Sequence, residues 1–277
     1  MDSTYRLRIR PAKRLFELKD LAEFWDFREL LLALAMRDIK LRYRQTALGF
    51  AWVILQPLLA SGILAFVFGM VAGVTKPGRS SVFVFVLAGF IGWSLFSTTF
   101  SRASQSLLQH SALISKVFFP RIILPVSVVG SALLDLALSL AVFFIMVIAS
   151  GTPVGSEILV APIWLVLLLT LSLGLGLFSA ALSVRFRDVQ HITPFFVQIL
   201  FYASPIAYQT AAVPEKWRLL FSLNPLVSIF EGLRWSLLGE GQLYLSGVLY
   251  CAFVSVLVLT LGFLFFRGAE RKFADLI

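Results

Sequence analysis

The chain has 277 residues, of which 59% are hydrophobic and only 14% are charged. Because an ordinary soluble domain carries about 25% charged residues, this composition excludes a soluble globular protein and indicates a chain that crosses a membrane several times. The net charge of +9 does not point to nucleic acid, since reading bases or following phosphates requires a basic surface in water.

Six nearly uncharged windows are long enough to cross a bilayer, which takes about 20 mostly apolar residues per helix. They are residues 45–75, 80–101, 122–156, 158–184, 189–214 and 241–266. Of the 24 Lys and Arg residues, 19 lie before the first window, in alternate gaps and after the last window, and 5 lie in the other gaps. The positive-inside rule then places both termini in the cytoplasm. We predict an all-α multi-pass protein of the cytoplasmic (inner) membrane, with a six-helix transmembrane domain at 47–266 and a cytoplasmic tail at 267–277.

The N-terminal part is expected to contain a cytoplasmic segment, 1–24, and an amphipathic helix, 25–46. At helical spacing, one face of the helix carries Leu32, Met36, Ile39 and Tyr43, and a neighbouring stripe carries Arg37, Lys40 and Arg44. An apolar face edged by cations suits a helix in the membrane interface. A strand is the alternative, since apolar and basic residues alternate over 39–44; the helical pattern begins earlier and persists longer.

The longest internal cytoplasmic gap, 102–121, contains a semi-apolar stretch that predicts a short coupling helix within 105–119. Two interpretations stay open for it: a connector that lies against lipid, or a surface that docks onto a soluble partner.

Asp135 interrupts the third span. It follows Arg121 by 14 residues, or roughly 21 Å of helix at 1.5 Å per residue. A carboxylate inside a span indicates a functional site by default. The alternative is a structural acid beside a Ser, an Arg or water nearer the interface. No basic partner is visible within the spans, and one acid is a poor proton relay.

Between the fifth and sixth spans, residues 219–230 form an uncharged stretch that is too short to span, split by Asn224-Pro225. Two short re-entrant helices fit best, because non-spanning helices are tolerated where they are buried in protein or line a cavity. Residues 213–235 are therefore the segment most suggestive of a gate. The candidate gate residues are Trp217, Leu219, Leu220, Phe221, Asn224, Pro225 and Trp235.

The motifs of an enzyme are missing from the sequence. There is no G-x-x-x-x-G-K-[ST] phosphate loop, and one Cys with two His makes a metal site improbable. Cys251 is interpreted as a small buried apolar residue. Energy for active transport would have to come from another chain or from an ion gradient. An ion-coupled carrier should show internal repeats and several polar sites at mid-depth, and an intramembrane lipid transferase several acids or histidines; neither pattern is visible.

The run Arg-Asp-Ile-Lys-Leu-Arg-Tyr-Arg-Gln-Thr-Ala-Leu-Gly at 37–49, followed by Trp52 and Gln56-Pro57, resembles the opening signature of type-2 ABC exporter permeases for polysaccharides. These are the membrane subunits of O-antigen, teichoic-acid and capsule exporters. Further matches, in the same order, are Phe118-Phe119-Pro120-Arg121, Arg185-Phe186-Arg187-Asp188, Ser204-Pro205-Ile206 and Asn224-Pro225-Leu226. The resemblance extends over residues 27–270.

The resemblance implies a permease that forms a homodimer and pairs with two copies of an ABC ATPase subunit, which would bind ATP and Mg²⁺; this chain would bind no cofactor. A lipid-linked polysaccharide would pass between the two permeases. The implied ATPase-docking residues are Arg37, Lys40, Arg44, Leu108, Leu113, Ile114, Lys116, Arg185, Arg187 and Asp188. Candidates for the translocation path are Trp52, Trp93, Asp135 and Tyr202. A drug or lipid exporter permease would share the architecture, whereas a carrier or a transferase belongs to another class.

Overall fold

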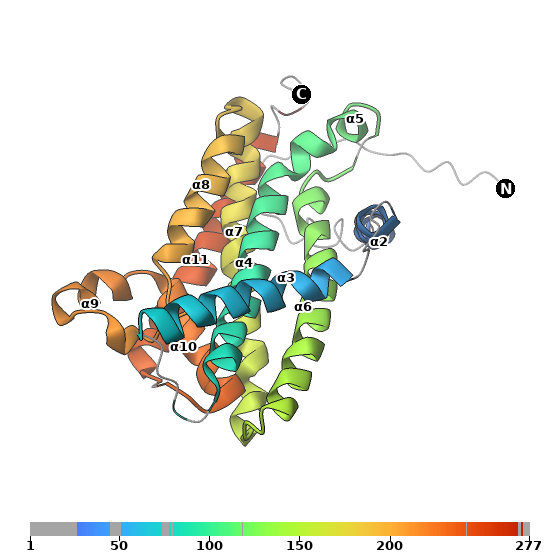
Figure 1. Ribbon diagram of the computed structural model, residues 1–277. Helices are drawn as coiled ribbons and strands as arrows, with labels where there is room; N and C mark the ends of the chain where they lie inside the picture. The colour runs from blue at the N-terminus through green and yellow to red at the C-terminus, as the bar shows by residue number, and fades with distance from the viewer. Residues whose placement is uncertain are drawn as a thin grey trace.

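The structure, a computed structural model, describes residues 27–44, 51–73, 78, 80–117, 119–241, 243–270 and 273, without the side chains of 42–44. Every regular element in this part of the chain is helical. Four long helices form a bundle in which α7 contacts α4 and α11, and α4 also contacts α6 (Figure 1). They are α4 (Val82–Gln109), α6 (Ile123–Ala149), α7 (Ala161–Arg185) and α11 (Leu245–Glu270). The predicted all-α class is confirmed.

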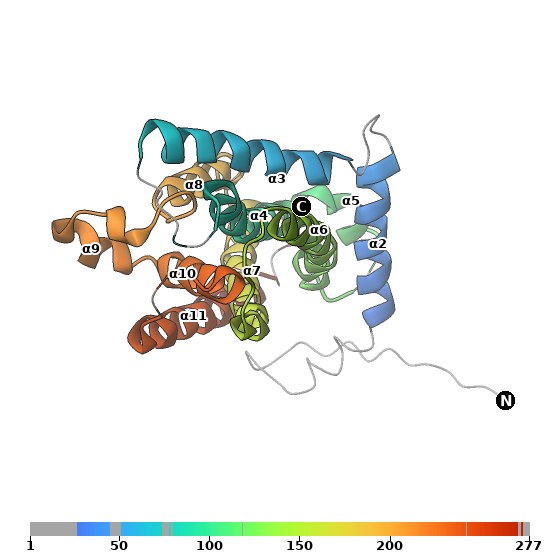
Figure 2. The same ribbon diagram turned by 60° about the horizontal axis from the view of Figure 1, so that its bottom comes forward.

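The shorter helices surround this bundle. Helix α2 (Arg28–Arg44) and helix α3 (Ala51–Leu64), which continues as the π-helical η1 (Ala65–Val71), lie across the long helices rather than along them (Figure 1 and Figure 2). Helix α8 (Val189–Tyr202) contacts α4 and α7, and α10 (Pro225–Leu238) packs against α4, α7 and α11. Helix α9 (Glu215–Ser222) protrudes from one side in both views. The connecting elements are α5 (Ser111–Ile114), η2 (Ser156–Val160) and η3 (Thr210–Ala212).

In the described part of the chain, five helices are long and apolar enough to cross a membrane. They are Ala51–Val71, Val82–Gln109, Ile123–Ala149, Ser156–Arg185 and Leu245–Glu270. The longest helix in the predicted fifth window is α8, whose 14 residues would extend about 21 Å against a hydrocarbon core of about 30 Å. Helix length therefore identifies five spans among the described residues, one fewer than the sequence predicts.

Small residues allow close contact between α7 and its neighbours. A Cβ atom added to Gly262 of α11 would lie 2.2 Å from the carbonyl oxygen of Gly174, and one added to Gly176 would lie 2.5 Å from the Cβ of Ala103 in α4. Close backbone approach is a general source of helix association in lipid, where apolar burial provides little driving force. The small residues thus place α7 at the centre of the bundle.

The structure has a helix where the sequence favours one over a strand, and α2 packs on α6 through residues outside the apolar face that the sequence assigns to the membrane interface. Leu34 and Ala35 are buried, and a Cβ atom on Gly130 of α6 would lie 2.8 Å from that of Ala35. Leu32 and Met36, from the predicted apolar face, are more than half exposed. That outward apolar side is the one available to lipid.

The predicted coupling helix at 105–119 is not one helix. Helix α4 continues through this stretch to Gln109, and the four-residue α5 follows after a turn at His110. Leu107 and Ile114 belong to an apolar cluster at the end of the bundle where α4, α7 and α11 finish and α6 begins. The mixed apolar and polar pattern of this stretch therefore arises because some of its side chains are buried against the bundle and others are exposed to solvent. Cys251 is fully buried, as predicted.

Candidate functional site

A cavity of about 410 Å³ lies between α3, α4, α6 and α8. Eight of its thirteen lining residues carry charged, amide or hydroxyl side chains, which makes it polar although its walls come largely from helices apolar enough to span. These eight are Gln56, Ser94, Ser97, Thr98, Ser101, Arg102, Asp135 and Ser139. Polar groups at membrane depth require protein partners or water, so such a cavity is the default place to look for a transported ligand.

The polar wall from α4 follows from helical spacing. Ser94, Ser97, Thr98 and Ser101 stand at i, i+3, i+4 and i+7, so they share one face of the helix. Leu95 is nearly fully buried on a different side. The serine-rich stretch is visible in the sequence, and its helical spacing is sufficient to predict one polar face on this helix.

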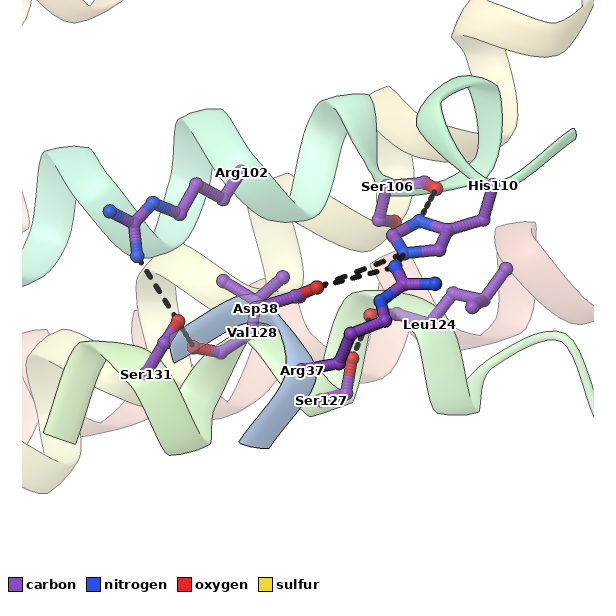
Figure 3. A network of polar contacts seen from close by, with 9 residues as sticks. All are labelled: Arg37, Asp38, Arg102, Ser106, His110, Leu124, Ser127, Val128 and Ser131. Carbon is purple, nitrogen blue, oxygen red and sulfur yellow. Dashed lines mark hydrogen bonds and ion pairs between the residues drawn. The ribbon is translucent and has the colours of Figure 1, made fainter. Parts of the chain in front are cut away.

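Asp135 has a basic partner. Nη1 of Arg102 lies 3.6 Å from Oδ2 of Asp135 and donates a hydrogen bond to Oγ of Ser131 at 3.1 Å (Figure 3). The expectation that the spans hold no such partner is wrong, because α4 does not end at residue 101. It continues for two more turns and carries Arg102 alongside α6, where the carboxylate compensates the guanidinium charge.

The structure brings together two of the four residues proposed for the translocation path. Trp93 and Asp135 both line the cavity, and the ring of Trp93 meets that of Phe201 edge-on at 5.3 Å between centroids. Trp52 on α3 and Tyr202 at the end of α8 are largely exposed and lie outside the cavity wall. Gln56, from the motif residues Gln56-Pro57, does line it.

A second polar cluster joins α2 to the corner between α4 and α5 (Figure 3). His110 donates from Nδ1 to the carbonyl oxygen of Ser106 at 2.8 Å, and Arg37 donates to Nε2 of the same ring. A guanidinium can only donate, so Nε2 of His110 is the acceptor in this pair. Oδ1 of Asp38 lies 3.3 Å from Nη2 of Arg37. Arg37 was expected at a docking surface, whereas His110 had no motif that identified it.

The candidate docking residues are divided between surface and core. Exposed side chains are those of Arg37, Lys40, Lys116, Arg185, Arg187 and Asp188. Leu108 and Leu113 are half-buried, and the side chain of Arg44 lies outside the described residues. Ile114 is only 7% exposed and belongs to the same cluster as Leu107 and Phe119. The structure therefore assigns Ile114 to the core of the chain, and the remaining exposed residues stay candidates for docking.

The candidate gate segment folds as two helices that break at Asn224-Pro225. The side chain of Asn224 caps α10 by accepting from the backbone N–H of Leu226 at 3.1 Å, and its amide donates to the carbonyl oxygen of Ala203 at 2.9 Å. Pro225 occupies the first helical position, where a missing N–H costs nothing. Trp217, Leu219 and Leu220 of α9 are exposed, Phe221 and Trp235 are half-buried, and α10 is mostly buried.

Arg234 is buried in α10, although the sequence suggests a charge in an external loop. It donates to the carbonyl oxygens of Pro205 and Tyr208 and lies 4.4 Å from the centre of the Phe85 ring. Burial lowers the pKa of its guanidinium to about 10, so it stays protonated at neutral pH. Arg234 thus fastens the segment after α8 to α10 and α4.

The family model described as ABC-2 type transporter matches residues 29–238. The chain belongs to this family. The resemblance that begins at residues 37–49 is thereby confirmed at the level of the family, and this ABC-2 chain is a multi-pass membrane protein from a family of transporter permease subunits.

Named relatives align with this ABC-2 permease along most of their length. It is 30% identical to the O-antigen export system permease protein RfbA of Myxococcus xanthus, over 92% of this chain and 98% of that protein. It is 27% identical to an RfbA permease of Klebsiella pneumoniae, over 90% and 95%. It is 26% identical to the polysialic acid transport protein KpsM of Escherichia coli, over 86% and 93%.

Proposed function

We propose that this permease is the membrane subunit of an ATP-driven exporter that moves a lipid-linked polysaccharide across the cytoplasmic membrane. The observation that carries the proposal is its alignment with O-antigen and polysialic acid export permeases over more than nine-tenths of their length. The polar cavity between otherwise apolar helices supports it, because a glycan needs hydrogen-bonding partners while it crosses hydrocarbon.

Energy would come from a separate ABC ATPase subunit that binds ATP and Mg²⁺, with two copies serving a permease homodimer. The surface we assign to docking is the end of the bundle at α5 and at the turn between α7 and α8 (Figure 1). It presents Lys116, Arg185, Arg187 and Asp188 to solvent. Charged side chains at an exposed end suit recognition of a soluble partner, because complementary charges accelerate and orient its approach.

The direction of the helices supports a topology with six crossings. Gly174 of α7 contacts Gly262 of α11, and Arg185 at the end of α7 lines the same pocket as Ala269 near the end of α11. The two helices therefore run in the same direction. Two parallel spans need a return crossing between them, and α8 with residues 203–209 is the segment available for it.

The charge asymmetry persists after the structure is taken into account. Arg102 pairs with Asp135 inside the bundle and Arg234 is buried in α10, one from each side of the original division. Without them the division is 18 against 4, which still supports the proposal that both termini lie in the cytoplasm, by the positive-inside rule.

The gate is assigned to α9 and α10 on the side opposite the docking surface. Trp217, Leu219 and Leu220 are exposed on a helix that protrudes from the bundle (Figure 2). Apolar side chains that meet across a dimer axis can close a pore by excluding water. The buried anchor at Arg234 and the cap at Asn224 would hold α10 fixed while α9 moves.

Deletion of the chain in its native cell tests the proposal. Surface polysaccharide should fall while its lipid-linked form accumulates inside, and the intact chain supplied in trans should restore both. The tagged chain should co-purify an ABC ATPase and should hydrolyse no ATP alone. Normal surface polysaccharide in the deletion strain would reject the proposal.

A further inference from the structure

We propose that the cavity between α3, α4, α6 and α8 is a binding subsite for uncharged sugar residues. The inference rests on the proposed export of a glycan and adds the chemical class that this site accepts. Three properties of the cavity carry it: its charge balance, its hydrogen-bonding groups and its aromatic wall.

Among the residues that the structure describes, one ion pair balances the charge of the cavity. Arg102 and Asp135 are the only charged side chains among the described lining residues, and their nearest charged atoms are 3.6 Å apart. The side chain of Asp135 is 14% exposed and that of Arg102 31%, so both lie largely away from bulk water. Because an uncompensated charge in such surroundings is costly, an acidic sugar or a phosphate would need a surplus cation that the described part of the wall does not supply. A neutral sugar needs none.

The hydrogen-bonding groups match the needs of sugar hydroxyls, which both donate and accept. The carboxylate of Asp135 only accepts, the guanidinium of Arg102 only donates, and the hydroxyls of Ser97, Thr98 and Ser101 can do either. The wall thus offers complementary partners on neighbouring turns of α4 and on α6. An acceptor, a donor and hydroxyls that can do either can together bind two neighbouring sugar hydroxyls. The ligand needs no net charge for this.

The aromatic wall completes the match. Phe90 and Trp93 line the cavity together with the serine stripe, and Trp93 is 6% exposed, which fixes its ring in place. A pyranose has an apolar C–H face and a polar rim, so aromatic side chains next to polar groups suit it. The volume of about 410 Å³ lies in the range of about 300–1,000 Å³ that is usual for small-ligand pockets.

Protection of an introduced cysteine tests the subsite in the complete permease–ATPase complex. Ser97→Cys, in a Cys251→Ala background, is labelled with a small maleimide in the presence of neutral gluco-, manno- or galacto-heptasaccharides, or of an oligogalacturonate of equal length. Ser246→Cys, which is exposed and lies outside the cavity, is the control for general effects of sugar. The same labelling is repeated with Asp135→Asn and with the double variant Arg102→Gln/Asp135→Asn.

At least one neutral heptasaccharide should slow labelling at position 97, and oligogalacturonate should not. Asp135→Asn leaves a surplus cation, so it should weaken protection by the neutral sugar about tenfold, or about 1.4 kcal/mol, and should create protection by oligogalacturonate. The uncharged double variant should again prefer the neutral sugar. A merely structural role of the pair would not reverse the preference.

Equal protection by the acidic and neutral sugars would overturn the inference, as would absence of protection by every neutral sugar. These outcomes leave the proposed function standing if glycan export still depends on the chain. Conversely, if the deletion strain exports its polysaccharide normally, the proposed function fails whatever the labelling shows.

Discussion

The contact between α7 and α11 yields a prediction whose size follows from two distances. A Cβ atom at Gly262 would lie 2.2 Å from the carbonyl oxygen of Gly174 and 3.0 Å from its carbonyl carbon, whereas ordinary contact begins at 3.4 Å. The shortfall is about 1.2 Å. Both atoms belong to the backbone, so no side chain can rotate away, and Gly262→Ala must push the two helices apart.

Moving the two helices apart lowers stability, because a gap of about 0.5–1 Å removes about a quarter to a half of the contact energy between the facing atoms. Overpacking costs about 1–3 kcal/mol, and replacing glycine by alanine inside a helix returns about 0.5–1 kcal/mol. We expect Gly262→Ala to destabilise the protein by about 1–2 kcal/mol. Gly268→Ala lies in the same helix with nothing within 4 Å, so it should leave stability unchanged or slightly raised.

The assay is the midpoint of thermal unfolding of the purified permease in one detergent, with both variants measured beside the parent. A loss of 1 kcal/mol lowers this midpoint by about 2–4 °C for a chain of this size range, so Gly262→Ala should unfold several degrees earlier than Gly268→Ala. If the two variants unfold together, α7 and α11 do not make the contact described.

Three further predictions concern topology, docking and the gate. Cysteines introduced at Ser156 should be labelled from outside intact spheroplasts and those at Ser111 only after permeabilisation; external labelling at Ser111 would reject the orientation. Ile114→Asp should lower the yield of folded permease, because it buries a charge, whereas Lys116→Glu should leave the yield unchanged and weaken co-purification of the ATPase. Normal yield of the first variant, or normal co-purification with the second, would contradict these assignments. Crosslinking Leu219→Cys between two copies should stop export while the complex still binds ATP; undiminished export in a fully crosslinked complex would remove α9 from the gate.

Much of the fold could be predicted because its signals are local. Hydropathy windows located the long helices, and Asn224-Pro225 marked the break between α9 and α10, since an Asn cap followed by Pro is a local helix-start signal. The helical spacing of apolar and basic residues also predicted helix α2. What a window does not report is which side of a helix faces protein, so the packing face at Leu34 and Ala35 was missed.

The site was less predictable because it depends on contacts between distant segments. The sequence places Arg102 in a loop, since a charged residue ends an uncharged window, yet Asp135 lies beside it in space and compensates its charge. The sequence predicts Ile114 at the surface, because nothing in a short cytoplasmic segment indicates which residues cover an apolar side chain, whereas the structure buries it in the apolar cluster. Such pairings become visible only when the helices are placed side by side.

The most direct test of the central claim is transport by the purified permease and its ATPase in liposomes loaded on one side with the lipid-linked polysaccharide. We predict that ATP makes the glycan accessible to a lectin on the opposite side, and that neither subunit does so alone. ATP hydrolysis by an intact complex that moves a drug or a simple lipid but leaves the glycan where it started would contradict the account.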